Sequence, residues 1–139
     1  MVIVVDTSVL VAAWRSRQGA SFALVSQIGL GKFEVAVSVP LALEYESALL
    51  RNLAPGKLTP GDVRIFVDFI CSVAQRQDIF FLWRPMLRDP NDDMVAEVAV
   101  AAACNAIITH NTRDFAGLDR FQITVQTPQE FIRTLGDKR

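Results

Sequence analysis

Carboxylate side chains recur in this sequence near points where a buried strand is expected to end. The first is Asp6, which directly follows the apolar run Val2–Val5. Four apolar residues without alternating polar ones are typical of a strand buried on both faces. Taken alone, Asp6 has a simple explanation, because Asp6 or Thr7 could cap a helix that begins here. The stretch by itself favours capping.

Further acids follow the later strands. Glu44 lies on the helix after Ser38, Asp93 lies in the first turn of a helix, and Asp114 follows the apolar segment that ends at His110. In a parallel sheet, functional residues gather beyond the carboxyl ends of the strands. This repetition indicates a shared acidic site, which a purely structural explanation would not require.

Each of these acids also has a structural explanation. Asp89, followed by Pro90, suits a helix N-cap, and Asp92 suits a capping box. Asp93 is not needed for capping, and Glu97 lies one turn later in a helix otherwise made of Val and Ala. Because a buried carboxylate is costly without a partner, we expect Asp93 and Glu97 to face a polar cleft.

The residues alone leave the other two acids open. Glu44 could be a solvated helix residue, since the apolar and acidic positions around it do not divide into clear stripes. Asp114 could be a first-turn acid of a short helix capped by Asn111 or Thr112.

If these acids converge, the chemistry they favour is metal-dependent hydrolysis. Two carboxylates about 5 Å apart repel by roughly 3 kcal/mol at an effective dielectric near 20, so a cation is needed among them. Oxygen ligands of this kind select Mg²⁺ or Mn²⁺, which can lower the pKa of a bound water and bind a phosphodiester oxygen. His110 is the only histidine, which argues against a histidine-rich zinc site. No nucleophile elbow, glycine-rich phosphate loop or CxxC motif is found. The pattern indicates a metal-dependent nuclease.

The composition is that of one folded domain. The chain has 139 residues, 51% hydrophobic and 21% charged, with a net charge of −1. That balance argues against a general basic nucleic-acid coat, but it allows a local basic rim. Cys71 and Cys104 lie in apolar helical patterns and suit a reducing, cytoplasmic setting. No signal peptide or membrane-spanning stretch is expected.

Buried strands that alternate with amphipathic helices position these acids. Strands are expected at 2–5, 33–38, 79–83, 106–110 and 121–126, and helices at 7–14, 21–31, 39–52, 63–76, 89–104 and 128–135. Residues 54–62 are expected to form a loop and 136–139 a flexible tail. The alternation predicts a single domain, 1–139, with a three-layer α/β/α sandwich around a parallel sheet of four to five strands.

Three segments together resemble the PIN domain, in particular the toxin components of bacterial VapBC-like toxin–antitoxin systems. They are VVDTSVLVAA, SVPLALEYESALLR and DPNDDMVAEVAVAAACNAIITHNTRDF, and the resemblance spans essentially the whole chain. It implies an α/β/α sandwich that cleaves RNA with Mg²⁺ or Mn²⁺, forms a homodimer and is neutralised by a small VapB-like antitoxin.

The resemblance also assigns roles to residues. The family's acids correspond to Asp6, Glu44, Asp93 and Asp114, with Asp6 and Asp93 as the chief metal ligands and the other two as possible ligands. Many members have aspartate at Asn111, so the fourth position is shared between Asn111 and Asp114. Supporting roles are implied for Thr7, Ser8, Glu97 and Asn111. Candidates for a basic rim are Arg15, Arg17, Arg84, Arg88 and Arg113, and candidates for an interface are Trp14 and Trp83. The simpler roles are ordinary solvated surface for the arginines and core packing for the tryptophans.

Two other functions are compatible with the same sequence. A degenerate PIN domain could act as a non-catalytic RNA- or protein-binding module. The second alternative is a receiver or another phosphotransfer domain on a similar sheet. A receiver needs a lysine late in the chain, and the late lysine here is Lys138 in the tail, which argues against a receiver.

Overall fold

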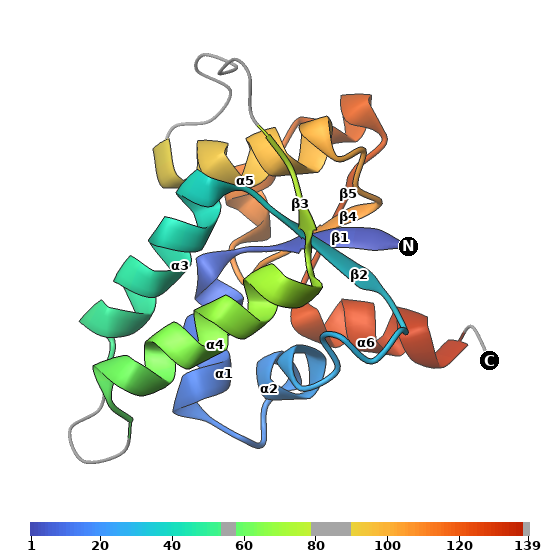
Figure 1. Ribbon diagram of the computed structural model, residues 1–139. Helices are drawn as coiled ribbons and strands as arrows, with labels where there is room; N and C mark the ends of the chain where they lie inside the picture. The colour runs from blue at the N-terminus through green and yellow to red at the C-terminus, as the bar shows by residue number, and fades with distance from the viewer. Residues whose placement is uncertain (54–57, 79–89, 138–139) are drawn as a thin grey trace.

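Five parallel strands form the centre of the molecule in a computed structural model that describes residues 1–53, 58–78 and 90–137 (Figure 1). The strand order is β3-β2-β1-β4-β5. The strands are β1 (Val2–Val5), β2 (Glu34–Val37), β3 (Gln75–Arg76), β4 (Ala106–Ile108) and β5 (Thr124–Gln126). Every pairing is parallel, as in the predicted α/β fold.

The first strand occupies the middle of this sheet. Ile3 pairs with Val35 of β2 on one side and with Ala106 of β4 on the other. Ile3 and Val4 are fully buried, which confirms the prediction of a strand covered on both faces. Because β1 and β4 are neighbours, the residues that follow them, Asp6 and Thr109, meet at the same edge of the sheet.

Helices cover both faces of the sheet, with α5 above the strands and α6 below them in Figure 1. The α-helices are α1 (Thr7–Arg15), α2 (Ala20–Val25), α3 (Val39–Arg51), α4 (Pro60–Val73), α5 (Pro90–Ala101) and α6 (Pro128–Asp137). Two short 3₁₀ helices, η1 (Thr112–Phe115) and η2 (Leu118–Phe121), connect β4 to β5. Within the described residues, no helix is long and apolar enough to cross a membrane.

Helix boundaries account for several differences from the predicted elements. The second helix ends at Val25 rather than continuing to Gly31, and Gly29 and Gly31 take left-handed φ values of 86° and 88° in the turns that follow. The fourth helix begins at Pro60, inside the predicted loop, because Thr59 and Asp62 form a capping box.

The edge strand and the chain end also differ. Gln75 and Arg76 form β3 beside β2, where the end of a helix was expected. The strand predicted at 79–83 lies outside the described residues. Gly136 and Asp137 belong to α6 rather than to a tail, and residues 138–139 lie outside the described part of the chain.

Both cysteines are free thiols. Cys104 is buried in the core, and burial raises the pKa of its thiol to about 12. Cys71 is half-buried against the core, and burial likewise raises its pKa. Both therefore stay protonated near neutral pH and serve as small apolar residues, as the sequence predicted.

Candidate acidic site at the strand ends

An open pocket of about 720 Å³ lies beyond the carboxyl ends of β1 and β4. Its volume is in the range of ligand-binding pockets. Most of the predicted site residues line it. They are Asp6, Thr7, Ser8, Glu44, Asn111 and Asp114. The residues selected by the strand-end rule therefore come together at one edge of the sheet.

The carboxylate of Asp6 is held by two hydroxyls rather than capping the helix. Asp6 is the N-cap residue of α1, but its side chain makes no capping hydrogen bond. Instead, the Oγ of Ser8 (2.7 Å) and the Oγ1 of Thr109 (2.8 Å) both donate to its Oδ2. Asp6 is only 5% exposed, and Oδ1 accepts no hydrogen bond from the described residues. This arrangement fixes the carboxylate at the wall of the pocket.

Thr109 is a site residue that the sequence analysis missed. Its Oγ1 donates to Asp6 and also accepts from the backbone N–H of Asn111 at 3.0 Å. The side chain is fully buried. The available signal was a hydroxyl residue directly after the apolar run of β4, at the point where that strand leaves the sheet.

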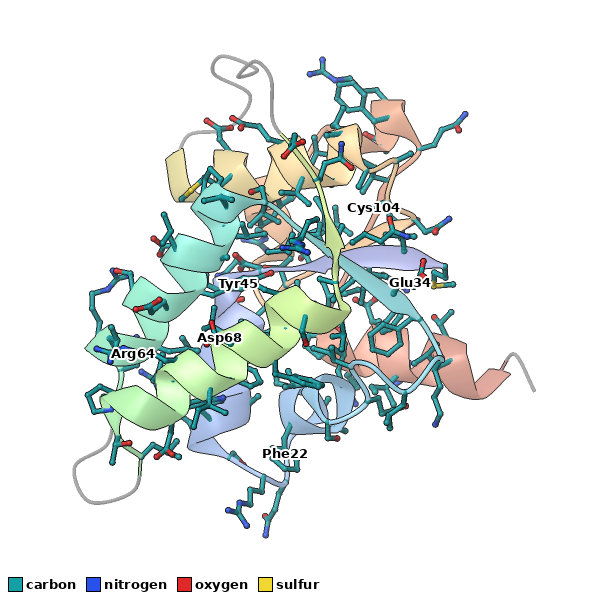
Figure 2. All side chains as sticks on the ribbon, viewed as in Figure 1. Phe22, Glu34, Tyr45, Arg64, Asp68 and Cys104 are labelled. Carbon is teal, nitrogen blue, oxygen red and sulfur yellow. The ribbon has the colours of Figure 1, made fainter. Side chains whose placement is uncertain are left out.

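Tyr45 is a second residue that was missed. Its hydroxyl reaches from α3 into the core and donates to the backbone carbonyl of Val5, the residue before Asp6 (Figure 2). Burial, and secondarily the charge of Asp6, raises the pKa of this phenol far above its ordinary value of 10.0. Tyr45 is therefore a neutral donor that ties α3 to the end of β1.

Glu44 lies in the pocket, next to a cation that was not predicted there. Its Oε1 is 3.2 Å from a guanidinium nitrogen of Arg51, two helical turns further along α3. The Glu44 side chain is 15% exposed and that of Arg51 is 59% exposed. An ion pair this exposed contributes at most about 1 kcal/mol to stability, so Glu44 can exchange this partner for another cation.

The acids of α5 divide differently from the prediction. Asp92, which was assigned to capping, lines the pocket. Asp93 and Glu97 are 9% and 7% exposed, and each has an interaction partner. Both were expected to face a polar cleft, but neither is among the residues that line this pocket; each is buried in an apolar helix and has a partner, as burial of a carboxylate requires. Asp89 lies outside the described residues.

Asn111 and Asp114 both reach the pocket from the segment after β4. Asn111 precedes η1 without a side-chain capping bond, and its backbone carbonyl accepts from the N–H of Asp114 at 3.0 Å. Phe115, fully buried, fixes this short helix to the core. Both side chains therefore line the pocket, and which of them fills the family's fourth position stays a prediction.

The predicted basic rim is partly present. Arg15 lines the pocket and donates to Oδ1 of Asn52 at 2.6 Å, while Arg17 lines a neighbouring apolar pocket. Arg113 is exposed on η1. Trp14 is half-buried against Phe66, with ring centroids 5.2 Å apart, which favours its core role. The remaining candidates, Arg84, Arg88 and Trp83, lie outside the described residues.

The donor chemistry of the pocket fits a hard divalent cation, since its carboxylates offer only oxygen atoms. Within the described ranges, however, no three His, Cys, Asp or Glu side chains come close enough together to hold a metal ion. Asp6 is a fixed candidate ligand, and the complete ligand set stays a prediction.

The parallel sheet and the acids that line a pocket at the carboxyl ends of its strands place this protein among α/β proteins with an acidic site at the strand ends. The chain belongs to the PIN domain family, because the model of the PIN domain matches residues 2–113. This match confirms the resemblance seen in the sequence.

Two solved structures share the fold. The structure of VapBC-1 from nontypeable Haemophilus influenzae matches with a TM-score of 0.58 and 15% identity, covering 93% of this chain and 99% of that chain. The structure of VapBC2 from Rickettsia felis, bound to a DNA fragment from their promoter, matches with a TM-score of 0.59 and 14% identity, covering 91% and 98%. At 15% and 14% sequence identity, these two matches show that the fold is shared and nothing finer. No curated protein matches the chain.

Proposed function

We propose that this PIN domain is a metal-dependent endoribonuclease and the toxin of a VapBC-like toxin–antitoxin pair. The observation that carries the proposal is the pocket at the ends of β1 and β4, which Asp6, Glu44 and Asp114 line together. Concentrated negative charge beyond the strand ends suits a divalent cation and, through it, a phosphodiester.

The resemblance predicts Asp6 and Asp93 as the chief ligands of a bound Mg²⁺ or Mn²⁺, with Glu44 and Asp114 as possible further ligands. Asp6, Glu44 and Asp114 line the pocket, and Asp93 follows Asp92, which lines it too. Such an ion supplies an activated water and neutralises charge on a phosphodiester oxygen. The protein's own contribution is orientation. Ser8 and Thr109 hold Oδ2 of Asp6, so the other oxygen keeps one direction when a ligand binds.

The positive charges at the rim suit an RNA backbone. Arg15 and Arg51 line the same pocket as the acids, and both are exposed enough to reach a phosphate. If a cation were to take Glu44 as a ligand, Arg51 would lose this ion pair, keep its hydrogen bond to the Ser47 hydroxyl, and have a guanidinium nitrogen for a phosphate oxygen.

A small VapB-like antitoxin partner, a homodimer and a cytoplasmic setting belong to the same proposal. The antitoxin is supported by the two structural neighbours, which are VapBC assemblies. It would neutralise the toxin by covering the acidic pocket.

RNA cleavage by the purified protein tests the proposed activity. We expect structured RNA to be cut in the presence of Mn²⁺ and to stay intact when a chelator is added. Asp6→Asn removes the charge but preserves the shape, and its loss of activity should be on the order of a hundredfold or more. Asp68→Asn on the exposed surface of α4 is the matched control and should cleave as the wild type does.

A second function, a non-catalytic RNA- or protein-binding module, is favoured by one observation. Within the described residues, the acids do not approach one another as closely as metal ligands must. In that case Asp6→Asn and the wild type would behave alike, or neither would cleave, while RNA or protein binding would persist.

A further inference from the structure

A buried serine on α2 is hydrogen-bonded to the histidine at the pocket. The Oγ of Ser21, on α2, lies 2.7 Å from Nε2 of His110, which is 89 residues further along the chain. Ser21 is only 4% exposed, whereas His110 is exposed and lines the pocket. The pair therefore joins a buried point on α2 to the loop that follows β4.

His110 stands between two residues that organise the site. Thr109 before it donates to Asp6, and Asn111 after it lines the pocket. The backbone N–H of His110 also donates to Oγ of Ser8 at 3.3 Å, and Ser8 in turn donates to Asp6. Both hydroxyls that hold Asp6 are thus connected to His110. Thr109 is its neighbour in the chain, and Ser8 accepts a hydrogen bond from its backbone N–H.

Ser21 does not have the surroundings of a nucleophile. It is buried and does not line the pocket, so a substrate in the pocket would meet His110 and not the serine hydroxyl. What the contact does is restrict the histidine ring. It adds a side-chain restraint to a loop whose backbone N–H groups donate to Gln126 (from Thr109), to Ser8 (from His110) and to Thr109 (from Asn111).

We propose that Ser21 is a positioning residue that acts through His110 to keep Thr109 and Asn111 in place around Asp6. This inference rests on the proposed ribonuclease function, since its consequence is a correctly oriented Asp6 carboxylate. In this role the histidine ring serves as a hydrogen-bonding link to α2, and proton transfer by the ring is not required.

Paired variants test this role by kinetics. Ser21→Ala should lower kcat for RNA cleavage by about tenfold or more, with little change in KM, because orientation of the site is affected rather than RNA binding. Ser26→Ala is the matched control, since Ser26 lies just after the same helix, is exposed, and donates its hydroxyl to the nearby Ala23 carbonyl. It should leave both constants unchanged.

Substitutions of His110 separate positioning from ring chemistry. A glutamine amide can place a polar atom near the Nε2 position and keep the contact with Ser21, whereas the shorter asparagine cannot. We therefore expect His110→Gln to retain most of kcat and His110→Asn to lose as much as Ser21→Ala. Full loss in both histidine variants would assign the function to the ring itself and overturn the proposal.

Amide hydrogen exchange measures the same link without any RNA. The backbone N–H groups of His110 and Asn111 should exchange about tenfold faster in Ser21→Ala than in the wild type, as expected for loss of one supporting hydrogen bond. In Ser26→Ala they should not change. If the wild type cleaves no RNA, the proposed function fails while this comparison still decides the inference. Unchanged exchange in Ser21→Ala would overturn it.

Discussion

At the scale of single residues, the site depends on hydroxyl groups as much as on acids. Asp6 is nearly fully buried, yet its Oδ2 accepts two hydrogen bonds, from Ser8 and from Thr109. Bonds to the ionised form offset the cost of removing a carboxylate from water. Asp6 could be singled out from the sequence because it directly follows a recognisable strand, whereas the residues alone left Glu44 and Asp114 open. Thr109 could not, because a threonine at the end of an apolar run is equally common as a plain strand residue.

The hydroxyl of Thr109 can be tested by an isosteric substitution. Thr109→Val keeps the volume but removes both the donor to Asp6 and the acceptor for the Asn111 N–H. We expect the free energy of unfolding to fall by about 1–3 kcal/mol and RNA cleavage to fall about 10- to 100-fold. Chemical denaturation and cleavage kinetics measure the two effects.

Thr124→Val, on the exposed side of β5, is the control for this substitution. It should change neither quantity by much, since a valine is well tolerated on a strand. Wild-type cleavage by the Thr109→Val protein would mean that the orientation of Asp6 does not depend on this hydrogen bond.

At the scale of elements, apolar patterning predicted the central strands and failed at the sheet edge. The runs 2–5 and 106–108 are buried on both faces, so they leave a clear signal. The edge strand β3 consists of Gln75 and Arg76, both exposed, and only its pairing with Ala36 and Val37 defines it. A local pattern cannot show a pairing made by tertiary contact. The early start of α4 was missed because Pro60 and Gly61 suggested a loop, while the capping box of Thr59 and Asp62 starts the helix.

The last helix offers a prediction about pH. Thr127 and Glu130 form a reciprocal pair at its start: the Thr127 N–H donates to Oε1 of Glu130 (2.9 Å), and the Glu130 N–H donates to the threonine hydroxyl (3.2 Å). The hydrogen bond from the Thr127 N–H, and after it the Thr127 side chain, lower the pKa of Glu130 below its ordinary value of 4.5. A lowered pKa in the folded state means that the contribution to stability is present above pH 4.5 and is lost as the pH falls below it.

Glu130→Ala should therefore lower the free energy of unfolding by about 0.5–1 kcal/mol at pH 7. The difference from the wild type should shrink once the pH falls below 4.5, where Glu130 of the wild type becomes protonated. Urea denaturation at pH 7 and below pH 4 measures both values. Glu46→Ala on α3 is the comparison variant. If the difference in free energy of unfolding between Glu130→Ala and the wild type stays constant with pH, the role of the ionised pair is contradicted.

At the scale of the whole molecule, the strand order assembles the site. The order β3-β2-β1-β4-β5 places β1 beside β4, so residues about a hundred positions apart in the chain share one pocket. The existence of this edge could be predicted from alternating strands and helices. The exact lining could not, since Asp92 rather than Asp93 reaches the pocket and Arg51 pairs with Glu44, both of which depend on helix register and side-chain direction.

Binding of Mn²⁺ by the RNA-free protein is the most direct test of the metal site, because it requires no knowledge of the RNA that is cut. Titration followed by electron paramagnetic resonance measures free and bound Mn²⁺ for the wild type, Asp6→Asn and Asp68→Asn. We predict that the wild type and Asp68→Asn bind Mn²⁺ alike and that Asp6→Asn binds at least about tenfold more weakly. Equal binding by all three proteins, or none by the wild type, would contradict a metal site built around Asp6.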